Sequence, residues 1–171
     1  MPLLKLAVHP DARDYAQKIM IERHSTRAIV MRGESILLLY TQRYQDYSLP
    51  GGGLDDGEDV IAGLKRELSE ETGAQNIRDI QAFGIYEEYR PWHRDGAEVM
   101  HMFSYCYRCQ IDDALGETAF ESHEINNGMK PVWVNIHEAI AHNQATMANS
   151  PSKGMSIERE TFLLQHIAQI R

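Results

Sequence analysis

The alternation of hydrophobic and polar positions predicts strands over much of the chain. Runs of branched and aromatic residues bounded by turn-forming residues favour strands. These runs cover residues 3–8, 26–31, 36–40, 79–88, 99–110 and 132–135. The polar residues 32–35 separate the second run from the third and predict a hairpin. One helix is expected near the start of the chain, at residues 12–21.

A different periodicity predicts a helix in the middle of the chain. Its apolar positions recur at helical spacing and are Val60, Ile61, Leu64 and Leu68. Asp55 or Asp56 can cap the start of this helix, with Glu58 or Asp59 as the reciprocal partner three residues later. Gly73 stands where a left-handed C-terminal cap is needed.

Two further helical patterns, at residues 136–147 and 156–170, follow the last strand. Strands dominate the middle, with helices inserted and appended, so the expected fold class is α+β with a mixed sheet. No repeat and no Pro/Gly/Ser-rich linker divides the chain. We therefore expect a single domain over residues 1–171, with an N-terminal extension at 1–25 and a C-terminal helix at 155–171.

Composition narrows the range of functions. The net charge is −8 and no basic run occurs, so binding to nucleic acid through phosphate neutralisation is not expected. No apolar run reaches the length of a membrane span, and the N-terminus becomes polar too quickly for a signal peptide. Cys106 and Cys109 are the only cysteines, and positions three apart on a strand face opposite sides. We predict two unpaired cysteines and a cytoplasmic protein.

The predicted central helix concentrates negative charge. Glu67, Glu70 and Glu71 lie at positions i, i+3 and i+4, so their carboxylates share one face and repel each other. The loop at 47–53 ends in three glycines and lets the backbone approach a ligand closely. A hard divalent cation held by carboxylates and substrate phosphates would balance this charge. The alternative is that the glutamates form an ordinary solvated face.

The spacing of the fixed residues favours the first interpretation. They follow the order Gly, five residues, Glu, seven residues, Arg-Glu, an aliphatic, one residue, Glu-Glu, one residue, Gly and an aliphatic. In this chain they are Gly52, Glu58, Arg66, Glu67, Leu68, Glu70, Glu71, Gly73 and Ala74. The segment resembles the Nudix box, except that Ala74 is smaller than usual. The resemblance implies a Nudix-like αβα sandwich with a mixed β-sheet between helices. It also implies hydrolysis of a nucleoside diphosphate linked to another moiety.

The resemblance also implies roles for the motif residues. Glu67, Glu70 and Glu71, with the backbone carbonyl of Gly52, would bind Mg²⁺ or Mn²⁺. Glu58 and Arg66 would hold the geometry of the motif, as would Gly73 at the helix end. A clustered carboxylate such as Glu67 or Glu70 can also accept a proton from water.

A fourth catalytic carboxylate is expected outside the motif. In many Nudix hydrolases a glutamate in the loop before the final strand completes the metal site or serves as base. Glu117, Glu121 and Glu124 are within reach in this chain. Glu121 is our first choice and Glu124 our second. The alternative is that both are loop surface charges.

Candidate substrate residues are Arg43, Arg90 and Trp92. Arg43 precedes the glycine-rich loop, where family members often touch substrate. Arg90 and Trp92 lie in a long expected loop between two strands, where Trp92 could stack on a base. The alternatives are a plain surface arginine and an exposed or interface tryptophan.

We expect the partner to be a small nucleotide-type substrate, such as a nucleotide, a nucleotide sugar or an ADP-ribose type molecule. No nucleic-acid or membrane partner is expected, and a homodimer fits the resemblance. One rival is an enzyme that removes oxidised nucleoside triphosphates. Another is a binding module that senses such ligands without turnover. The intact glutamates count against this second rival.

Overall fold

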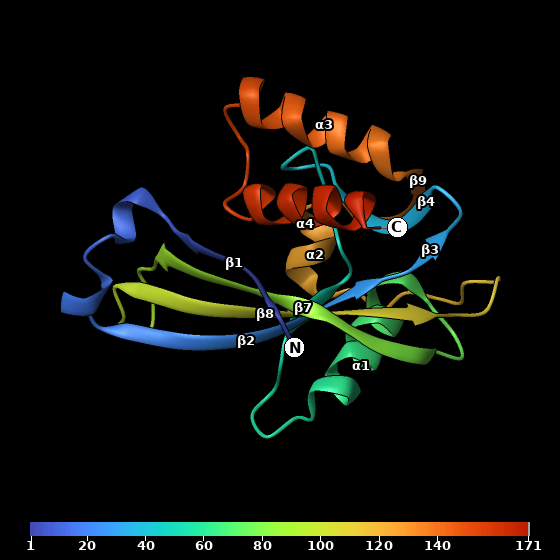
Figure 1. Ribbon diagram of the computed structural model, residues 1–171, viewed down its shortest axis with the longest axis horizontal. Helices are drawn as coiled ribbons and strands as arrows, with labels where there is room; N and C mark the ends of the chain where they lie inside the picture. The colour runs from blue at the N-terminus through green and yellow to red at the C-terminus, as the bar shows by residue number, and fades with distance from the viewer. Residues whose placement is uncertain (171) are drawn as a thin grey trace.

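The longest strands form a five-stranded mixed sheet. In the computed structural model, which describes residues 1–170, its strand order is β1-β7-β8-β2-β6 (Figure 1). β1–β7 and β2–β8 are parallel pairs, whereas β7–β8 and β2–β6 are antiparallel. The strands are β1 (Leu3–Val8), β2 (Met20–Ile29), β6 (Gly51–Gly53), β7 (Arg78–Pro91) and β8 (Val99–Gln110). The mixed sheet predicted from the sequence is confirmed.

A second, smaller sheet forms around β4. β4 pairs antiparallel with β3, β5 and β9, so strands distant in the chain become neighbours. Its members are β3 (Met31–Arg32), β4 (Ser35–Thr41), β5 (Asp46–Ser48) and β9 (Met129–Asn135). The predicted hairpin is present, with Arg32 opposite Ser35. The separation into two sheets was not part of the sequence prediction.

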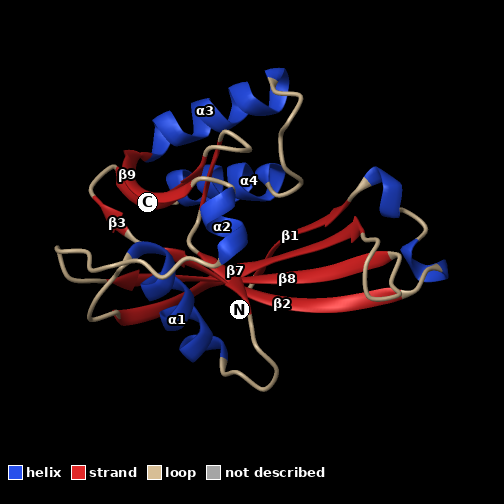
Figure 2. Ribbon diagram, turned by 180° about the vertical axis from the view of Figure 1, so that it is seen from behind, coloured by secondary structure: helices blue, strands red, loops and turns tan. Residues whose placement is uncertain are grey.

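Helices cover the large sheet on both faces (Figure 2). α1 (Val60–Thr72) lies on one face and α4 (Ile157–Gln169) on the other. α3 (Ile136–Asn149) lies on the outer side of α4 and also contacts β5 and β9 of the small sheet. The short helix α2 (Ser122–Asn126) was not predicted. This arrangement confirms the expected αβα class. The C-terminal helix was predicted to include residue 171, which lies outside the described residues.

Two apolar cores fix these layers. Leu64 and Leu68 of α1 pack with Ala28 of β2 in one core. Leu163 of α4 packs with Ile29 of β2 in the other core. Each fully buried side chain of this size contributes about 1.5–3 kcal/mol. Because Ala28 and Ile29 belong to different cores, successive β2 side chains point to opposite faces of the sheet, as strand geometry requires.

Two sequence predictions about local structure were wrong. Residues 12–21 do not form an α-helix: short 3₁₀ turns at Pro10–Ala12 and Tyr15–Gln17 precede β2. Met20 instead pairs with Val99 of β8, so sheet pairing overrides the local pattern. Residues 1–25 therefore include β1 and half of β2, which belong to the main sheet. The N-cap of α1 is Asp59, whose side chain accepts a hydrogen bond from the Ala62 amide at 3.1 Å, rather than Asp55 or Asp56.

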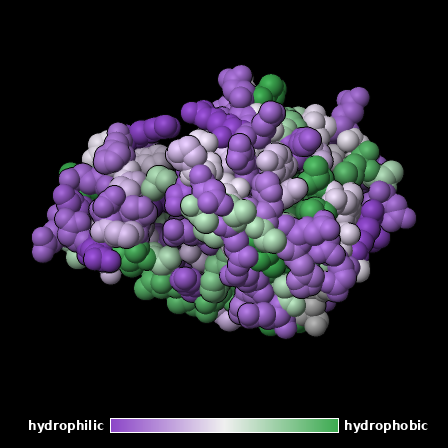
Figure 3. All heavy atoms as spheres, turned by 90° about the horizontal axis from the view of Figure 1, so that it is seen from above, coloured by the Kyte–Doolittle hydropathy of each residue, from purple (hydrophilic) through white to green (hydrophobic). Residues whose placement is uncertain are grey.

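The surface is mixed in polarity. Figure 3, a view from above, shows mainly polar side chains, with apolar ones gathered along the lower left edge. The exposed large apolar residues include Leu3, Leu6 and Val8 of β1 and Met20 at the start of β2. The homodimer stays a prediction, and it can be tested at these exposed apolar residues of β1 and β2. Among residues 1–170, no helix has both the length and the apolar character needed to cross a membrane.

Candidate active site

The glycines of β6 let helix α1 approach the strand. A Cβ on Gly51, whose φ is 153°, would lie 1.8 Å from the Thr26 carbonyl oxygen. A Cβ on Gly52 would lie 2.7 Å from Oε1 of Glu67. The Gly51 contact is with backbone and leaves no room for a side chain, whereas a side chain at Gly52 would displace the Glu67 carboxylate. The carboxylate of Glu67 therefore lies directly against the backbone of β6.

Two glutamates of α1 are buried at this contact. Glu71 accepts a hydrogen bond from the Gly51 amide at 2.7 Å. Burial raises the pKa of Glu71 to about 10, and a hydrogen bond with Glu124 adds to the rise. Burial also raises the pKa of Glu67, although Arg66 opposes the rise. Carboxylates in such a site favour either a proton or a cation.

Arg66 connects the start of the motif to the helix. It donates to Glu58 twice and to Glu67 at 3.1 Å, and it lies 3.5 Å from Glu70. The Arg66 bonds, followed by the Asp55 amide, lower the pKa of Glu58 to about 2. These contacts are those expected of residues that hold the geometry of the motif.

The predicted C-terminal cap of α1 is confirmed at Gly73, with φ of 75°. A Cβ there would lie 2.1 Å from the Gly116 carbonyl oxygen. Gly73 therefore both ends the helix and admits the loop that leads to α2.

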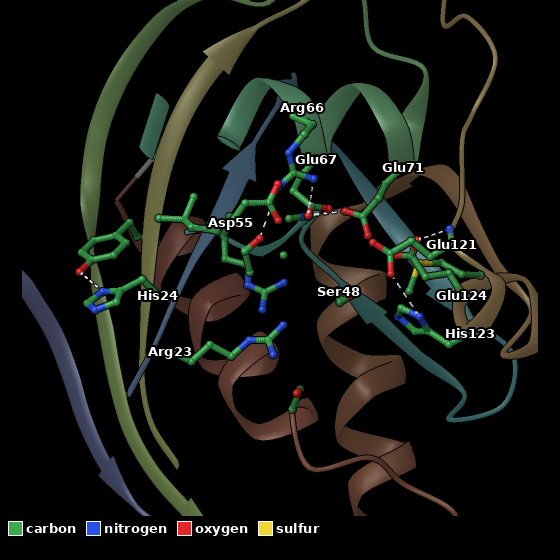
Figure 4. Close-up of a pocket in the computed structure, with 18 of the residues that line it drawn as sticks. Arg23, His24, Ser48, Asp55, Arg66, Glu67, Glu71, Glu121, His123 and Glu124 are labelled. Carbon is green, nitrogen blue, oxygen red and sulfur yellow. Dashed lines mark hydrogen bonds and ion pairs between the residues drawn. The ribbon is translucent and has the colours of Figure 1, made fainter. Parts of the chain in front are cut away.

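The loop predicted to supply a fourth carboxylate folds into α2. Glu121 and Glu124 form a capping box, and the Glu121 amide donates to Glu124 at 2.8 Å. Glu124 is buried and bonds to Glu71. The Glu121 side chain is 64% exposed and lies 3.4 Å from His123. Both line the cavity, but Glu124 is the one placed against the motif (Figure 4).

A cavity of about 880 Å³ is lined by most of these groups, namely Glu58, Arg66, Glu67, Glu71, Glu121 and Glu124, but not by Glu70. Its walls come from β2, β6, α1, α2 and the start of α4. A volume of this size is within the range of nucleotide-sized ligands. His24 and Tyr105 form one wall, joined by a hydrogen bond of 2.7 Å.

The predicted substrate residues lie elsewhere. Arg43 is exposed and donates to Asn127 at 3.1 Å. Arg90 belongs to β7 and not to a loop, and it donates to Glu88 at 3.0 Å. The guanidinium of Arg94 covers the ring of Trp92, with 5.5 Å to its centroid. None of the three lines the cavity, and their role in substrate binding stays a prediction.

Sequence reasoning missed several charged residues of the cavity wall. Arg159 and Glu160 of α4 are buried and paired with each other at 3.2 Å. Arg159 also binds Glu88 at 2.8 Å, and Glu160 accepts a hydrogen bond from the Leu49 amide. Arg23 and Arg27 of β2 are two further cations of the wall that were not predicted. For Arg27, the available sequence signal was an arginine inside an apolar strand run.

The expected metal ligands suit a hard divalent cation. They are the carboxylates of Glu67, Glu70 and Glu71 and the backbone carbonyl of Gly52, and Mg²⁺ prefers such oxygen ligands. Within residues 1–170, no three His, Cys, Asp or Glu side chains are already arranged around one point as metal ligands. In this arrangement the carboxylates of Glu67 and Glu71 are bonded to Arg66, Gly51 and Glu124. Binding a cation would require them to exchange those partners.

Comparisons with known proteins agree with the motif. The family model of the NUDIX domain matches residues 22–155. A mutator MutT protein from Bacillus halodurans is similar in structure, with a TM-score of 0.59 and 21% identity, over 85% of this chain and 81% of that one. A NUDIX hydrolase from Nitrosomonas europaea has a TM-score of 0.58 and 18% identity, over 86% of this chain and 90% of that one. At these identities, the solved structures support the fold.

Proposed function

The chain belongs to the Nudix family of hydrolases, and on that premise we propose that it cleaves, with Mg²⁺ or Mn²⁺, the pyrophosphate bond of a nucleoside diphosphate linked to another moiety. One observation carries the proposal. Glu67 and Glu71 of the motif lie beside Glu124 at the wall of a cavity of nucleotide size. Buried carboxylates clustered at a ligand-sized cavity are costly for the fold and are expected where they serve a ligand.

The residues would divide the work as follows. Glu67, Glu70 and Glu71, with the carbonyl of Gly52, would hold the cation. A bound divalent cation neutralises phosphate oxygens and acts as a Lewis acid. Arg66 would keep Glu67 oriented toward β6, since it donates to that carboxylate.

Glu124 would take the proton of the attacking water. The water oxygen forms a bond to one phosphorus, the bridging P–O bond breaks, and the proton passes to a carboxylate oxygen of Glu124. Glu124 suits this role because it is buried and already touches the motif through Glu71. Glu121 is more exposed and remains the alternative base.

The test is product release from a panel of ADP-ribose, nucleotide sugars, dinucleoside polyphosphates and nucleoside triphosphates. We expect turnover with Mg²⁺, none in excess EDTA, and a loss on the order of 100-fold in Glu70→Gln. Glu117→Gln, which changes an exposed glutamate away from the cavity, is the control. Full activity in EDTA would contradict the proposal. Preference for oxidised triphosphates, or ligand binding without turnover, would favour one of the two rivals.

A further inference from the structure

Arg27 is a buried cation without a partner. Its side chain is 9% exposed, and its Nε has no hydrogen-bond partner. No ion pair to its guanidinium occurs within residues 1–170. Arg159, the other buried arginine of the cavity wall, binds both Glu88 and Glu160. An unpaired buried charge costs several kcal/mol, so a fold that keeps one usually presents it to a ligand.

The neighbouring carboxylates are already engaged. Arg27 lies on the α4 side of the sheet, since Ile29, two residues further along β2, packs with α4. Burial and the charge of Arg159 lower the pKa of Arg27, against the opposing charges of Glu160 and Glu71. Glu160 is bonded to Arg159 and the Leu49 amide, while Glu71 is bonded to the Gly51 amide. Neither acid supplies an ion pair to Arg27.

Arg23 is a second unpaired arginine on the same strand. It lies four residues before Arg27, so both side chains leave β2 on the same face. Its guanidinium rests against Gly53, where a Cβ would be 2.7 Å from Nη2. Within the described chain it makes no hydrogen bond or ion pair. Figure 4 shows Arg23 reaching into the cavity from the side opposite Glu71 and Glu124.

β6 lies between these arginines and the glutamates of α1. Arg27 is opposite Gly51 in the register, and Gly53 carries the guanidinium of Arg23. The two arginines thus flank Gly52, whose other side receives Glu67. A diphosphate placed at Gly52 would have carboxylates on one side and guanidinium groups on the other.

We propose that Arg27 and Arg23 bind the phosphate group of the substrate that lies away from the glutamate cluster. The inference rests on the proposed function, and it makes these arginines specificity-determining residues. A cation held by the glutamates of α1 would neutralise one phosphate, and the guanidinium groups of Arg27 and Arg23 would bind the next phosphate directly. The site therefore requires two linked phosphates and rejects monophosphate esters. Arg27 is the main anchor, because its burial removes competition from water.

Binding of methylenebisphosphonate, a diphosphate analogue that resists hydrolysis, tests this assignment. Calorimetric titration is done with and without Mg²⁺ on the wild type, Arg27→Gln, Arg27→Lys and Arg23→Gln. We expect Arg27→Gln to weaken binding about 10- to 100-fold. Arg27→Lys should recover only part of the loss, since an ammonium lacks the guanidinium fork. Arg13→Gln, which removes an exposed charge outside the cavity, should bind as the wild type does.

Thermal melting without ligand separates binding from structure. Because Arg27 has no partner to lose, Arg27→Gln should melt at the same temperature as the wild type or higher. Equal binding by wild type and Arg27→Gln, or no binding by the wild type, would overturn the inference. A much lower melting temperature of unliganded Arg27→Gln would also overturn it, since that would reveal a structural role.

The two proposals fail in different ways. Turnover that depends on Mg²⁺ with an unchanged KM in Arg27→Gln would refute only the arginine site. Loss of analogue binding in Arg27→Gln without any turnover by the wild type would refute only the hydrolase proposal.

Discussion

Arg66 donates two hydrogen bonds to Glu58, from Nε to Oε2 at 2.8 Å and from Nη2 to Oε1 at 2.9 Å. Such a paired geometry holds both side chains in one orientation. It joins the loop before α1 to the second turn of the helix, next to Glu67. The geometry of the carboxylate cluster therefore depends on a contact outside it.

Glu58→Gln should lose stability in a pH-dependent way. The Arg66 bonds lower the pKa of Glu58 from 4.5 to about 2, so ionised Glu58 stabilises the folded state. This contribution is complete above the unfolded pKa of 4.5 and disappears as the pH falls toward 2. The melting-temperature difference between wild type and Glu58→Gln should shrink over this window. A melting-temperature difference that stayed constant from pH 6 to pH 3 would contradict this prediction. Glu117→Gln, at an exposed glutamate, is the control.

Asp46→Asn should stabilise the protein at neutral pH. Burial, followed by the charge of Glu160, raises the pKa of Asp46 from 3.8 to about 6. The folded state binds the proton more tightly than the unfolded state, so stability is lost as the pH rises from about 4 to 6. Above that window, the free energy of unfolding of Asp46→Asn should exceed that of the wild type by an amount on the order of 2 kcal/mol. Urea unfolding at pH 4 and pH 7.5 measures this, with the exposed Asp95→Asn as a matched control.

Glu71→Gln should separate metal binding from stability. Burial raises the pKa of Glu71 to about 10, so folding at neutral pH requires a proton that the unfolded carboxyl gives up. In EDTA the variant should melt above the wild type, by a margin that grows as the pH rises from 5 to 9. Added Mg²⁺ should stabilise the wild type more than the variant, because binding to the native state adds stability. Equal Mg²⁺-induced shifts would rule out Glu71 as a ligand.

Glu124→Gln should reduce kcat by about 100-fold or more if Glu124 takes the proton. Glutamine preserves the capping-box bond of α2, so the helix should persist. Glu121→Gln should have a smaller effect, because the Glu121 side chain is exposed and is not placed against the motif glutamates. The pH–rate profiles of both variants are the measurement. A larger loss of kcat in Glu121→Gln than in Glu124→Gln would instead identify Glu121, the first choice from the sequence, as the base.

Arg159→Met should destabilise the protein strongly. It removes the cation that pairs with buried Glu88 and Glu160, and breaking such a pair costs about 3–5 kcal/mol. Arg78→Met breaks a half-exposed pair with Asp112 and should cost less than about 1 kcal/mol. Urea unfolding compares the two. Similar losses would mean that burial adds nothing to the Arg159 pairs.

Local sequence signals located the parts of the site that depend on short-range geometry. Helix α1 and its Gly73 cap were predicted from residue spacing within one segment. The contact of Glu58 with Arg66 was expected from the resemblance to the Nudix box. The N-cap was wrong because three nearby aspartates can each cap a helix. In the structure, Asp59 caps the helix, and Glu58 accepts a hydrogen bond from the Asp55 amide.

Charges that meet through tertiary contacts were not predicted. The sequence places Arg27 in a strand but does not reveal that β6 and α4 bury it. The parallel pairing of β2 with β8 also converted residues 20 and 21, expected to be helical, into strand. Such pairing depends on partners far along the chain, which no local pattern encodes.

The position of α4 in the chain has a consequence for synthesis. Arg159 and Glu160 follow every strand in translation order, and Leu163 closes the core over β2. A nascent chain that has completed β9 still exposes that apolar sheet face, with Glu88 lacking Arg159 and the Leu49 amide lacking Glu160. Folding that proceeds from the N-terminus cannot complete the cavity at that stage. A premature stop codon before residue 157 would thus yield an aggregation-prone product, because α4 would be missing from the apolar face that it covers.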